Sequence, residues 1–226
     1  MPSCSATHCL DIEPDTRRVL SWAKDQSRKK AGNRFGQLGR GRACTLCAAP
    51  VALPAPVVDV SAGGGNDAGH SAAVTAAGDV YTWGCDRWQQ LGLGSPEAGA
   101  AGYTWQKGAI WQWEPQRAFV PVPVKQVACG DDHTVALAHD GRSIITWGRG
   151  EHGQLGRGRA LFVGAPARSD ALSHHDGDPS IAWVAALRNC SATVDERGNI
   201  IRTAGKCANV RQRLLDLCRK RHAIGS

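Results

Sequence analysis

Short apolar segments in this chain alternate with polar residues and are separated by tight turns that contain glycine. The alternation runs on both sides of Ala77-Gly78, Asp140-Gly141 and Arg197-Gly198. A period of two places every second side chain on one face of a strand, and glycine adopts the positive φ of a two-residue turn without strain. The pattern predicts successive β-hairpins and an all-β protein.

The hairpins belong to a longer unit that is repeated. Two copies share a His, a Trp and a Gln-Leu-Gly turn, at His70, Trp83 and Gln90 and again at His133, Trp147 and Gln154. The Gln follows the Trp by seven positions in both copies. A four-stranded unit of this kind cannot bury both faces alone, so neighbouring units are expected to stack. The recurring His and Trp are therefore interpreted as packing residues between units.

Two further copies are degenerate. The first keeps Trp22 and the turn at Gln37, with extra residues between them. The last has Cys190 in place of the His and Thr203 in place of the Trp, and it has lost the turn.

The strings Val127-Ala-Cys-Gly-Asp-Asp-His133, Ile145-Thr-Trp-Gly148 and His152-Gly-Gln-Leu-Gly156 resemble the repeat of the regulator of chromosome condensation family. The resemblance implies a β-propeller, which in that family usually has seven blades. It also implies two activities of the founding member, nucleotide exchange on a Ran-type small GTPase and chromatin binding. At roughly 50–65 residues per blade, 226 residues hold about four blades. We therefore predict a partial β-propeller of about four blades with a short C-terminal helix.

The repeats set the predicted boundaries. An N-terminal extension covers 1–18, the propeller-repeat domain covers 19–207, and a basic amphipathic helix covers 208–226. The predicted blades are roughly 19–41, 57–94, 121–158 and 181–205, with an insertion at 95–120.

Three tryptophans, Trp105, Trp111 and Trp113, lie within nine residues of the predicted insertion. An open arc of blades leaves uncovered surface at its ends. Tryptophan is enriched at the centres of protein interfaces. The three rings are therefore expected either to fold over the protein's own core or to contact a partner.

The net charge of +7 is concentrated at the two ends of the chain. Such clusters attract polyanions or acidic protein surfaces, and the alternative is a solvated face. The basic residues predicted to bind a partner are Arg28, Lys29, Lys30, Arg34, Arg40 and Arg42 near the N-terminus, and Arg213, Arg219, Lys220 and Arg221 in the tail. In the tail, Val210, Leu214, Leu217 and Cys218 recur at helical spacing, which favours a helix that caps the last blade over one that binds a membrane or calmodulin.

Nine cysteines in a chain without a visible targeting signal are interpreted as thiols of a reducing compartment, not as a disulfide framework. Cys44 and Cys47 have the spacing of half a zinc site, for which Cys4 and Cys9 could supply the other half. The alternative is two unconnected thiols in a loop.

No catalytic or nucleotide-binding motif is recognisable. Asp131 and Asp132 belong to the repeat, and His174-His-Asp176 is interpreted as a loop. We expect no enzyme activity, cofactor or membrane contact. The predicted function is a non-catalytic interaction or scaffold module in a large complex. Its expected partners are protein subunits, with RNA or another polyanion at the basic ends. The alternative is an exchange factor for a Ran-like small GTPase that also binds chromatin or nucleic acid.

Overall fold

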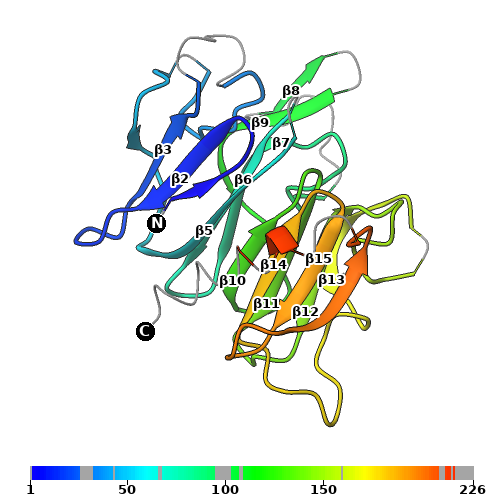
Figure 1. Ribbon diagram of the computed structural model, residues 1–226. Helices are drawn as coiled ribbons and strands as arrows, with labels where there is room; N and C mark the ends of the chain where they lie inside the picture. Colours follow the sequence, from blue (N-terminus) through cyan, green and yellow to red (C-terminus); the bar gives the residue numbers. More distant parts are fainter. Residues whose placement is uncertain are drawn as a thin grey trace.

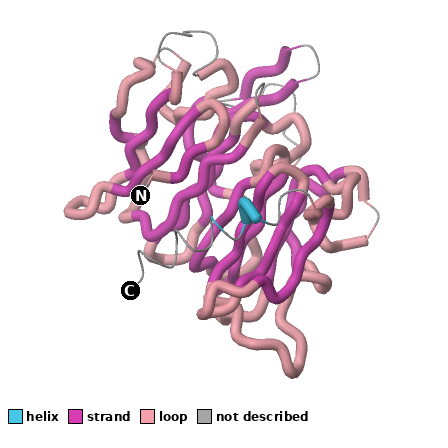
Figure 2. Tube along the Cα trace, viewed as in Figure 1, coloured by secondary structure: helices cyan, strands magenta, loops and turns pink. Residues whose placement is uncertain are grey.

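The computed structural model describes residues 2–25, 33–42, 44–65, 68–94, 103–106, 109–158, 160–208, 212–214 and 216. Within these ranges, sixteen strands form four antiparallel sheets that follow one another along the chain (Figure 1). Nearly all of the remaining described backbone is loop (Figure 2). The all-β, four-bladed propeller arrangement predicted from the repeats is confirmed.

The first two sheets come from the N-terminal half. Blade 1 consists of β1 (Ser3–Cys4), β2 (His8–Ile12), β3 (Val19–Ala23) and β4 (Ala49–Pro50). Blade 2 consists of β5 (Val57–Gly63), β6 (His70–Thr75), β7 (Val80–Cys85), β9 (Ala109–Arg117) and, outermost, β8 (Tyr103–Gln106).

The other two sheets differ in size. Blade 3 consists of β10 (Val124–Cys129), β11 (His133–Ala138), β12 (Ile144–Arg149) and β13 (Phe162–Arg168). Blade 4 has three strands in the described residues, β14 (Trp183–Leu187), β15 (Cys190–Val194) and β16 (Ile200–Gly205).

The blade boundaries differ from the predicted ones in two places. The segment 1–18, predicted as an extension, contains β1 and β2 of blade 1. Its β2–β3 turn lacks the glycine of the corresponding β6–β7, β11–β12 and β15–β16 turns, and Arg17 adopts a positive φ of 56° there. The described part of the predicted insertion 95–120 forms β8 and β9, so it belongs to blade 2.

Hydrophobic cores lie between successive blades, where alternate residues of facing sheets meet. The pairs that represent the three contacts are Leu10 with Trp83, Val80 with Trp147, and Leu137 with Val184. Every one of these side chains is fully buried. The cores make each blade a packing partner of the next.

A fourth core covers the far face of blade 4. Ala185, Ala192 and Val194 pack there with Leu214. Leu214 is fully buried, and the described residues 212–214 and 216 are helical. This contact agrees with the predicted capping of the last blade by the tail, although most of 208–226, including Val210, Leu217 and Cys218, lies outside the described residues.

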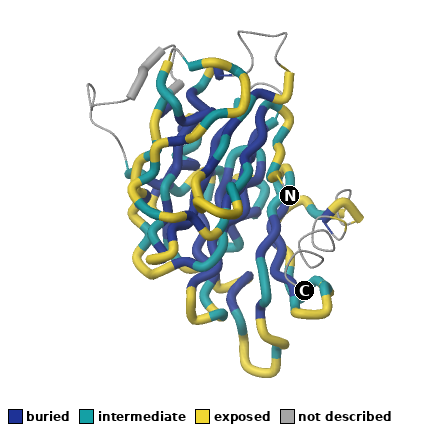
Figure 3. Tube along the Cα trace, turned by 90° about the vertical axis from the view of Figure 1, so that its left-hand side faces the viewer, coloured by how far each residue is buried: buried dark blue, intermediate teal, exposed yellow. Residues whose placement is uncertain are grey.

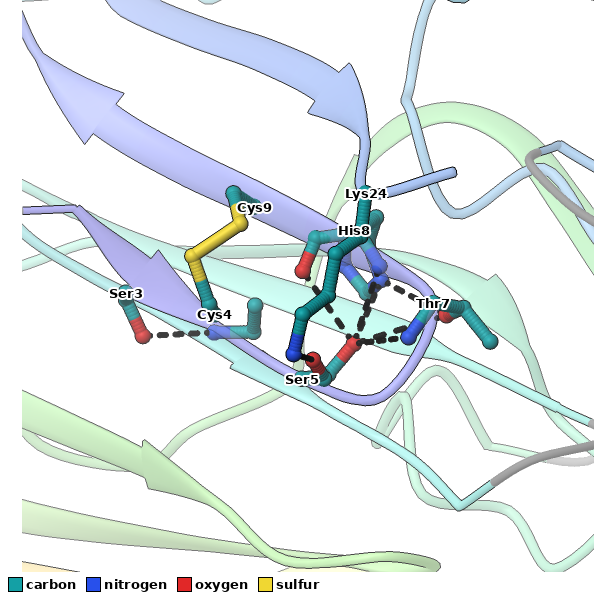
Figure 4. The surroundings of a disulfide bond; sticks show 8 residues. Ser3, Cys4, Ser5, Thr7, His8, Cys9 and Lys24 are labelled. Carbon is teal, nitrogen blue, oxygen red and sulfur yellow. Dashed lines mark hydrogen bonds between the residues drawn. A yellow bond between two sulfur atoms is a disulfide. The ribbon is translucent and has the colours of Figure 1, made fainter. Parts of the chain in front are cut away.

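The expectation that the cysteines form no disulfides is wrong for four of them. Cys4 and Cys9 are direct partners of the β1–β2 ladder, with Cα atoms 4.1 Å apart, and they are joined (Figure 4). Cys190 is joined to Cys207, which follows β16. The strand register places Cys4 opposite Cys9 and Cys190 opposite Gly205, two residues before Cys207, and this proximity was not visible in the sequence. The compartment stays a prediction.

Candidate partner-binding surface

A hydrogen-bond network connects each blade with the next. The His Nε2 atoms contact a hydroxyl of the following blade, at 2.7 Å for His8 and Ser71, 3.1 Å for His70 and Thr134, and 2.9 Å for His133 and Ser191. Each hydroxyl donates to a turn carbonyl, at 2.9 Å for Ser71 and Gln37, 2.9 Å for Thr134 and Gln90, and 2.7 Å for Ser191 and Gln154. The hydroxyl must then accept from the imidazole, so Nε2 carries the proton.

The three histidines have a structural role in this arrangement, since each connects its blade to the next. Each is fully buried. Burial lowers the pKa of His8 and His133 to about 3 and the pKa of His70 to about 4, so the imidazoles are neutral at pH 7. Their interpretation as packing residues between blades is confirmed.

The register corrects one alignment in the last repeat. Ser191 pairs with Ala204, as Thr134 pairs with Trp147. Ala204, and not Thr203, therefore occupies the position of the repeat Trp. The residues that follow Ala204 and Trp147 are Gly205 and Gly148, and both have a positive φ, which supports this alignment.

The glycine turn of blade 1 packs against β9 of blade 2. The Gly41 N–H donates to the Trp113 carbonyl at 3.2 Å. A Cβ at Gly36 would collide with the Gln112 carbonyl and lie 2.9 Å from the Trp113 Cα. Gly36 also has a φ of 76°, so this close approach requires glycine. Two segments that were predicted as separate candidates thus lie side by side.

Basic and aromatic side chains meet along this contact. The Arg34 guanidinium lies 5.2 Å from the Phe35 ring centre, and the Arg42 guanidinium lies 5.9 Å from that of Trp113. Phe35 contacts Trp111 edge to face at 5.5 Å. Arg34 and Arg42 are exposed, Phe35 and Trp113 are half-buried, and Trp111 is buried. We name Arg34, Phe35, Arg42 and Trp113 the basic–aromatic surface.

The other predicted basic residues have different roles or fall outside the described residues. Arg40 is engaged within blade 1, since its guanidinium donates to the carbonyls of Ser21, Thr45 and Cys47 at 2.9–3.2 Å. Arg213 is exposed on the short helix. Arg28, Lys29, Lys30, Arg219, Lys220 and Arg221 lie outside the described residues.

The tryptophan segment is divided between core and surface. Trp111 is only 7% exposed and lies opposite Cys85 in the ladder, whereas Trp113 reaches the basic–aromatic surface. Trp105 lies on β8, paired with Ile110. Core packing is therefore shown for Trp111, whereas contact of the half-buried Trp113 with a partner stays a prediction.

The zinc hypothesis finds no complete ligand set in the described residues. Cys4 and Cys9 are consumed by their disulfide. Cys44 and Cys47 are in no disulfide, and no group of three or more potential ligands was found in the described part of the chain. Burial raises the pKa of the Cys44 thiol, and the Asn33 amide contacts its sulfur at 3.1 Å.

A second basic–aromatic contact escaped the sequence analysis. The Arg149 guanidinium lies 4.5 Å from the Trp88 ring centre and 3.1 Å from the Asp132 carboxylate, and it also contacts Glu151. Trp88 stands two residues before Gln90, as Phe35 stands before Gln37. An aromatic side chain at this turn position was the signal that could have identified it.

Comparison with known proteins agrees with these blades. The regulator of chromosome condensation (RCC1) repeat matches residues 77–137, and a second form of the repeat matches 124–154. The chain belongs to the RCC1-repeat family. It covers only part of a full RCC1 propeller.

Relatives in the RCC1-repeat family are longer proteins. The RCC1 domain-containing protein RUG3, mitochondrial, of Arabidopsis thaliana is 27% identical over 87% of this chain and 40% of its own length. The E3 ubiquitin-protein ligase HERC2 of Homo sapiens is 33% identical over 74% of this chain and 3% of its own length. The chain thus spans less than half of these RCC1-repeat relatives.

Solved structures show the same fold. Human WBSCR16 superposes with a TM-score of 0.65 and 23% identity, over 88% of this chain and 45% of its own. Prp20p of Saccharomyces cerevisiae, described with its binding properties to Gsp1p and histones, superposes with a TM-score of 0.67 and 22% identity, over 91% and 43%. At this identity the likeness concerns the RCC1 propeller fold alone. In the described residues, no helix has the length and apolar character needed to cross a membrane.

Proposed function

We propose that this chain is a non-catalytic docking module of a larger assembly, and that the basic–aromatic surface is where it contacts a protein partner. The observation that carries the proposal is the convergence of Arg42 of the blade 1 turn with Trp113 of blade 2. Arginine and tryptophan are the residue types most enriched in the energetic centres of interfaces.

The geometry of the surface suits binding. The aromatic rings are fixed from below, because Phe35 packs on the buried Trp111 and the Trp113 backbone is bonded to Gly41. A ring held in place loses little conformational entropy when a partner covers it. The exposed guanidiniums of Arg34 and Arg42 supply charge at the rim, where they favour an acidic partner surface.

The buried polar residues favour a structural role over catalysis. The three network histidines have no solvent exposure, and their hydrogen bonds connect blades. A general base must reach the proton that it removes. These groups therefore support the proposal of a module that acts by contact.

Affinity purification of the tagged chain from its own cells tests the proposal. A partner that docks on this surface should be recovered with the wild type, survive nuclease treatment and weaken with salt. Trp113→Ala and Arg42→Ala should each reduce its recovery about tenfold or more, as expected for interface anchors. Arg168→Ala is the matched control, since Arg168 is also exposed and forms an ion pair with Asp170 at 3.1 Å. Equal recovery with all four proteins would refute this docking surface.

The alternative role, nucleotide exchange on a Ran-like small GTPase, has one observation in its favour, the fold shared with Prp20p, whose description names binding to Gsp1p and histones. It is tested separately by the release of labelled GDP. Acceleration by micromolar chain would favour exchange over docking, and recovery that is lost on nuclease treatment would favour RNA or DNA as the partner.

A further inference from the structure

Strand β13 of blade 3 is the counterpart of strand β9 of blade 2. In the two ladders, β13 has Phe162 opposite Arg149, and β9 has Trp111 opposite Cys85. Both ladders shift register at the same point, and both strands have a proline four residues after this aromatic position. The two strands therefore offer the same backbone positions to whatever lies outside them.

The outer edge of β9 carries a further strand, whereas the described residues place none on the outer edge of β13. In blade 2, β8 pairs with β9 along residues 109–112, with Thr104 opposite Trp111 (Figure 1). In blade 3, β13 is the last strand of its sheet. The positions of β13 that correspond to the β8-binding segment are residues 160–163.

The backbone of Phe162 is oriented for the same kind of pairing. The Leu161 carbonyl accepts from the Gly150 N–H at 2.8 Å, as the Ile110 carbonyl accepts from the Asp86 N–H at 2.8 Å. Successive residues of an antiparallel strand direct their backbone groups to opposite sides. The N–H and carbonyl of Phe162 therefore point away from β12, toward the outer edge.

Exposed apolar side chains lie on the same edge. In this protein exposed residues are found mainly in the loops, and the strands are largely buried or half-buried (Figure 3). Leu161 and Phe162 are 71% and 50% exposed, whereas Trp111 at the corresponding position of β9 is 7% exposed. Unpaired backbone groups on an apolar edge favour pairing with another chain.

Charged side chains border this apolar pair on one side. Arg149, opposite Phe162, contacts the carboxylates of both Asp132 and Glu151, so two carboxylates share one guanidinium. Glu151 is exposed and follows Arg149 by two positions, which places it toward the start of β13 in the antiparallel ladder. A basic side chain of a partner at this end of the edge would complement Glu151.

We propose that residues 160–163 of β13 bind an extended peptide of a partner protein, which joins blade 3 as an outer antiparallel strand. Peptides commonly bind exposed sheet edges in this way. The inference rests on the proposed docking function, but it uses an edge separate from Arg42 and Trp113.

The pairing of β8 with β9 indicates the chemistry of the peptide. β8 has a β-branched residue, Thr104, opposite the Phe162 counterpart and an aromatic residue, Trp105, opposite the Leu161 counterpart. Both residue types pack well across a strand pair. The peptide is therefore a β-branched residue followed by an aromatic one, with a lysine or arginine two positions later for Glu151. Pro166 lacks a backbone donor, which limits the pairing to the first half of β13.

Fluorescence polarisation with a labelled peptide and the full chain tests the proposal. The probe is Gly-Tyr-Thr-Trp-Gln-Lys, which repeats residues 102–107 of this chain. We expect saturable binding, which Phe162→Glu should weaken about tenfold or more, as expected for an interface anchor. Phe119→Glu is the matched control, since Phe119 is also aromatic and 70% exposed, and it should leave the affinity unchanged.

N-methylated probes distinguish strand pairing from contact of side chains alone. By the register of β8 on β9, the threonine N–H of the probe points toward β13 and the tryptophan N–H points away. Methylation of the threonine amide should weaken binding about tenfold or more, and methylation of the tryptophan amide should not. In the protein, the bound probe should slow hydrogen exchange of the Phe162 amide and leave that of Phe119, already bonded to the Gly92 carbonyl, unchanged.

Four results would overturn the proposal. They are no saturable binding, equal binding by wild type and Phe162→Glu, equal effects of the two N-methylations, and self-association of the chain through Phe162, which would assign the edge to a second copy. Circular dichroism verifies the fold of Phe162→Glu, and Leu161→Lys serves as a second variant. The probe does not involve Arg42 or Trp113, so failure of the basic–aromatic surface in affinity purification leaves this result unchanged.

Discussion

The His70 imidazole Nε2 lies 3.1 Å from the Thr134 hydroxyl, which joins blade 2 to blade 3 across 64 positions of sequence. Both side chains are fully buried. Thr134 in turn donates to the Gln90 carbonyl, which also accepts from the Trp147 indole. The Thr134 hydroxyl thus accepts from the buried His70 N–H and donates to the Gln90 carbonyl. Its removal would leave both groups without this partner.

Thr134→Val should destabilise the protein by about 1–3 kcal/mol, because it leaves the buried His70 N–H without an acceptor while the side-chain volume hardly changes. Urea unfolding monitored by tryptophan fluorescence gives the difference. Thr203→Val is the matched control, since Thr203 is an exposed residue of β16. It should change the unfolding free energy by less than about 0.5 kcal/mol. Equal effects of the two substitutions would contradict the role of the network.

The blades with a regular repeat could be predicted from the sequence, whereas the prediction of the first blade missed its strands β1 and β2. The hairpins of blades 2, 3 and 4 are marked by alternation and by Gly78, Gly141 and Gly198. In blade 1 the corresponding turn uses Arg17 at positive φ, which no sequence rule favours for a non-glycine residue. The strand β2 consequently had no visible boundary, although its apolar residues alternate.

The candidate surface required the structure for a different reason. Arg42 and Trp113 were each identified from residue type, but they are 71 positions apart and come from different blades. Their contact depends on the way in which the blade 1 turn packs on β9, which is set by Gly36 and Gly41. The disulfides were missed for the same physical reason, because Cys190 and Cys207 meet only through the β15–β16 register.

Loss of the Cys190–Cys207 disulfide should destabilise the last blade. The bond closes a loop across a sequence separation of 17 residues, for which chain-entropy arguments give about 3 kcal/mol. Thermal unfolding of the wild type and of Cys207→Ser, each with and without a reductant, measures this effect. Cys4→Ser is the comparison, and its smaller loop, with a separation of five, should give a smaller loss. A reductant that lowers the wild-type melting temperature no more than that of Cys207→Ser would contradict the prediction.

Acid should weaken the native state through the network histidines. Burial holds the pKa of His133 at about 3 in the folded chain, whereas an unfolded histidine titrates near its ordinary value of 6.5. The unfolded state therefore binds the proton first, and stability falls as the pH is lowered from about 6.5 toward 3. Each such histidine contributes a slope of about 1.4 kcal/mol per pH unit within that window.

His133→Gln isolates this contribution, because the amide can donate to Ser191 but does not titrate. The variant should lose less stability than the wild type between pH 7 and pH 4.5, measured by urea unfolding at each pH. His152→Gln is the control, since His152 is only half-buried. Parallel pH profiles for wild type and His133→Gln would show that the buried imidazole is not the source of acid sensitivity.

Asp86 should have the opposite pH dependence. Its carboxyl is only 1% exposed, one oxygen accepts from the Leu91 N–H at 3.0 Å, and the other has no hydrogen-bond partner. Burial raises the pKa of Asp86 to about 7, so the folded state holds a proton that the unfolded state has released. Stability contributed by this group is therefore lost as the pH rises from about 4 through 7.

The first repeat shows that asparagine can take the place of Asp86 without burying a charge. Asn33 stands four residues before Gln37, as Asp86 stands before Gln90. Its oxygen accepts from the Leu38 N–H at 3.0 Å, and its amide donates to the Gly41 carbonyl at 3.1 Å.

Asp86→Asn should therefore stabilise the protein by about 1–3 kcal/mol at pH 8, and the gain should vanish below about pH 4. Asp140→Asn, which replaces the exposed carboxylate oxygen that accepts from the Ser143 hydroxyl, should not stabilise. No gain in stability of Asp86→Asn at pH 8 would contradict the prediction. It would mean that the folded protein holds an ionised Asp86 at no cost in free energy, although one of its buried oxygens has no hydrogen-bond partner.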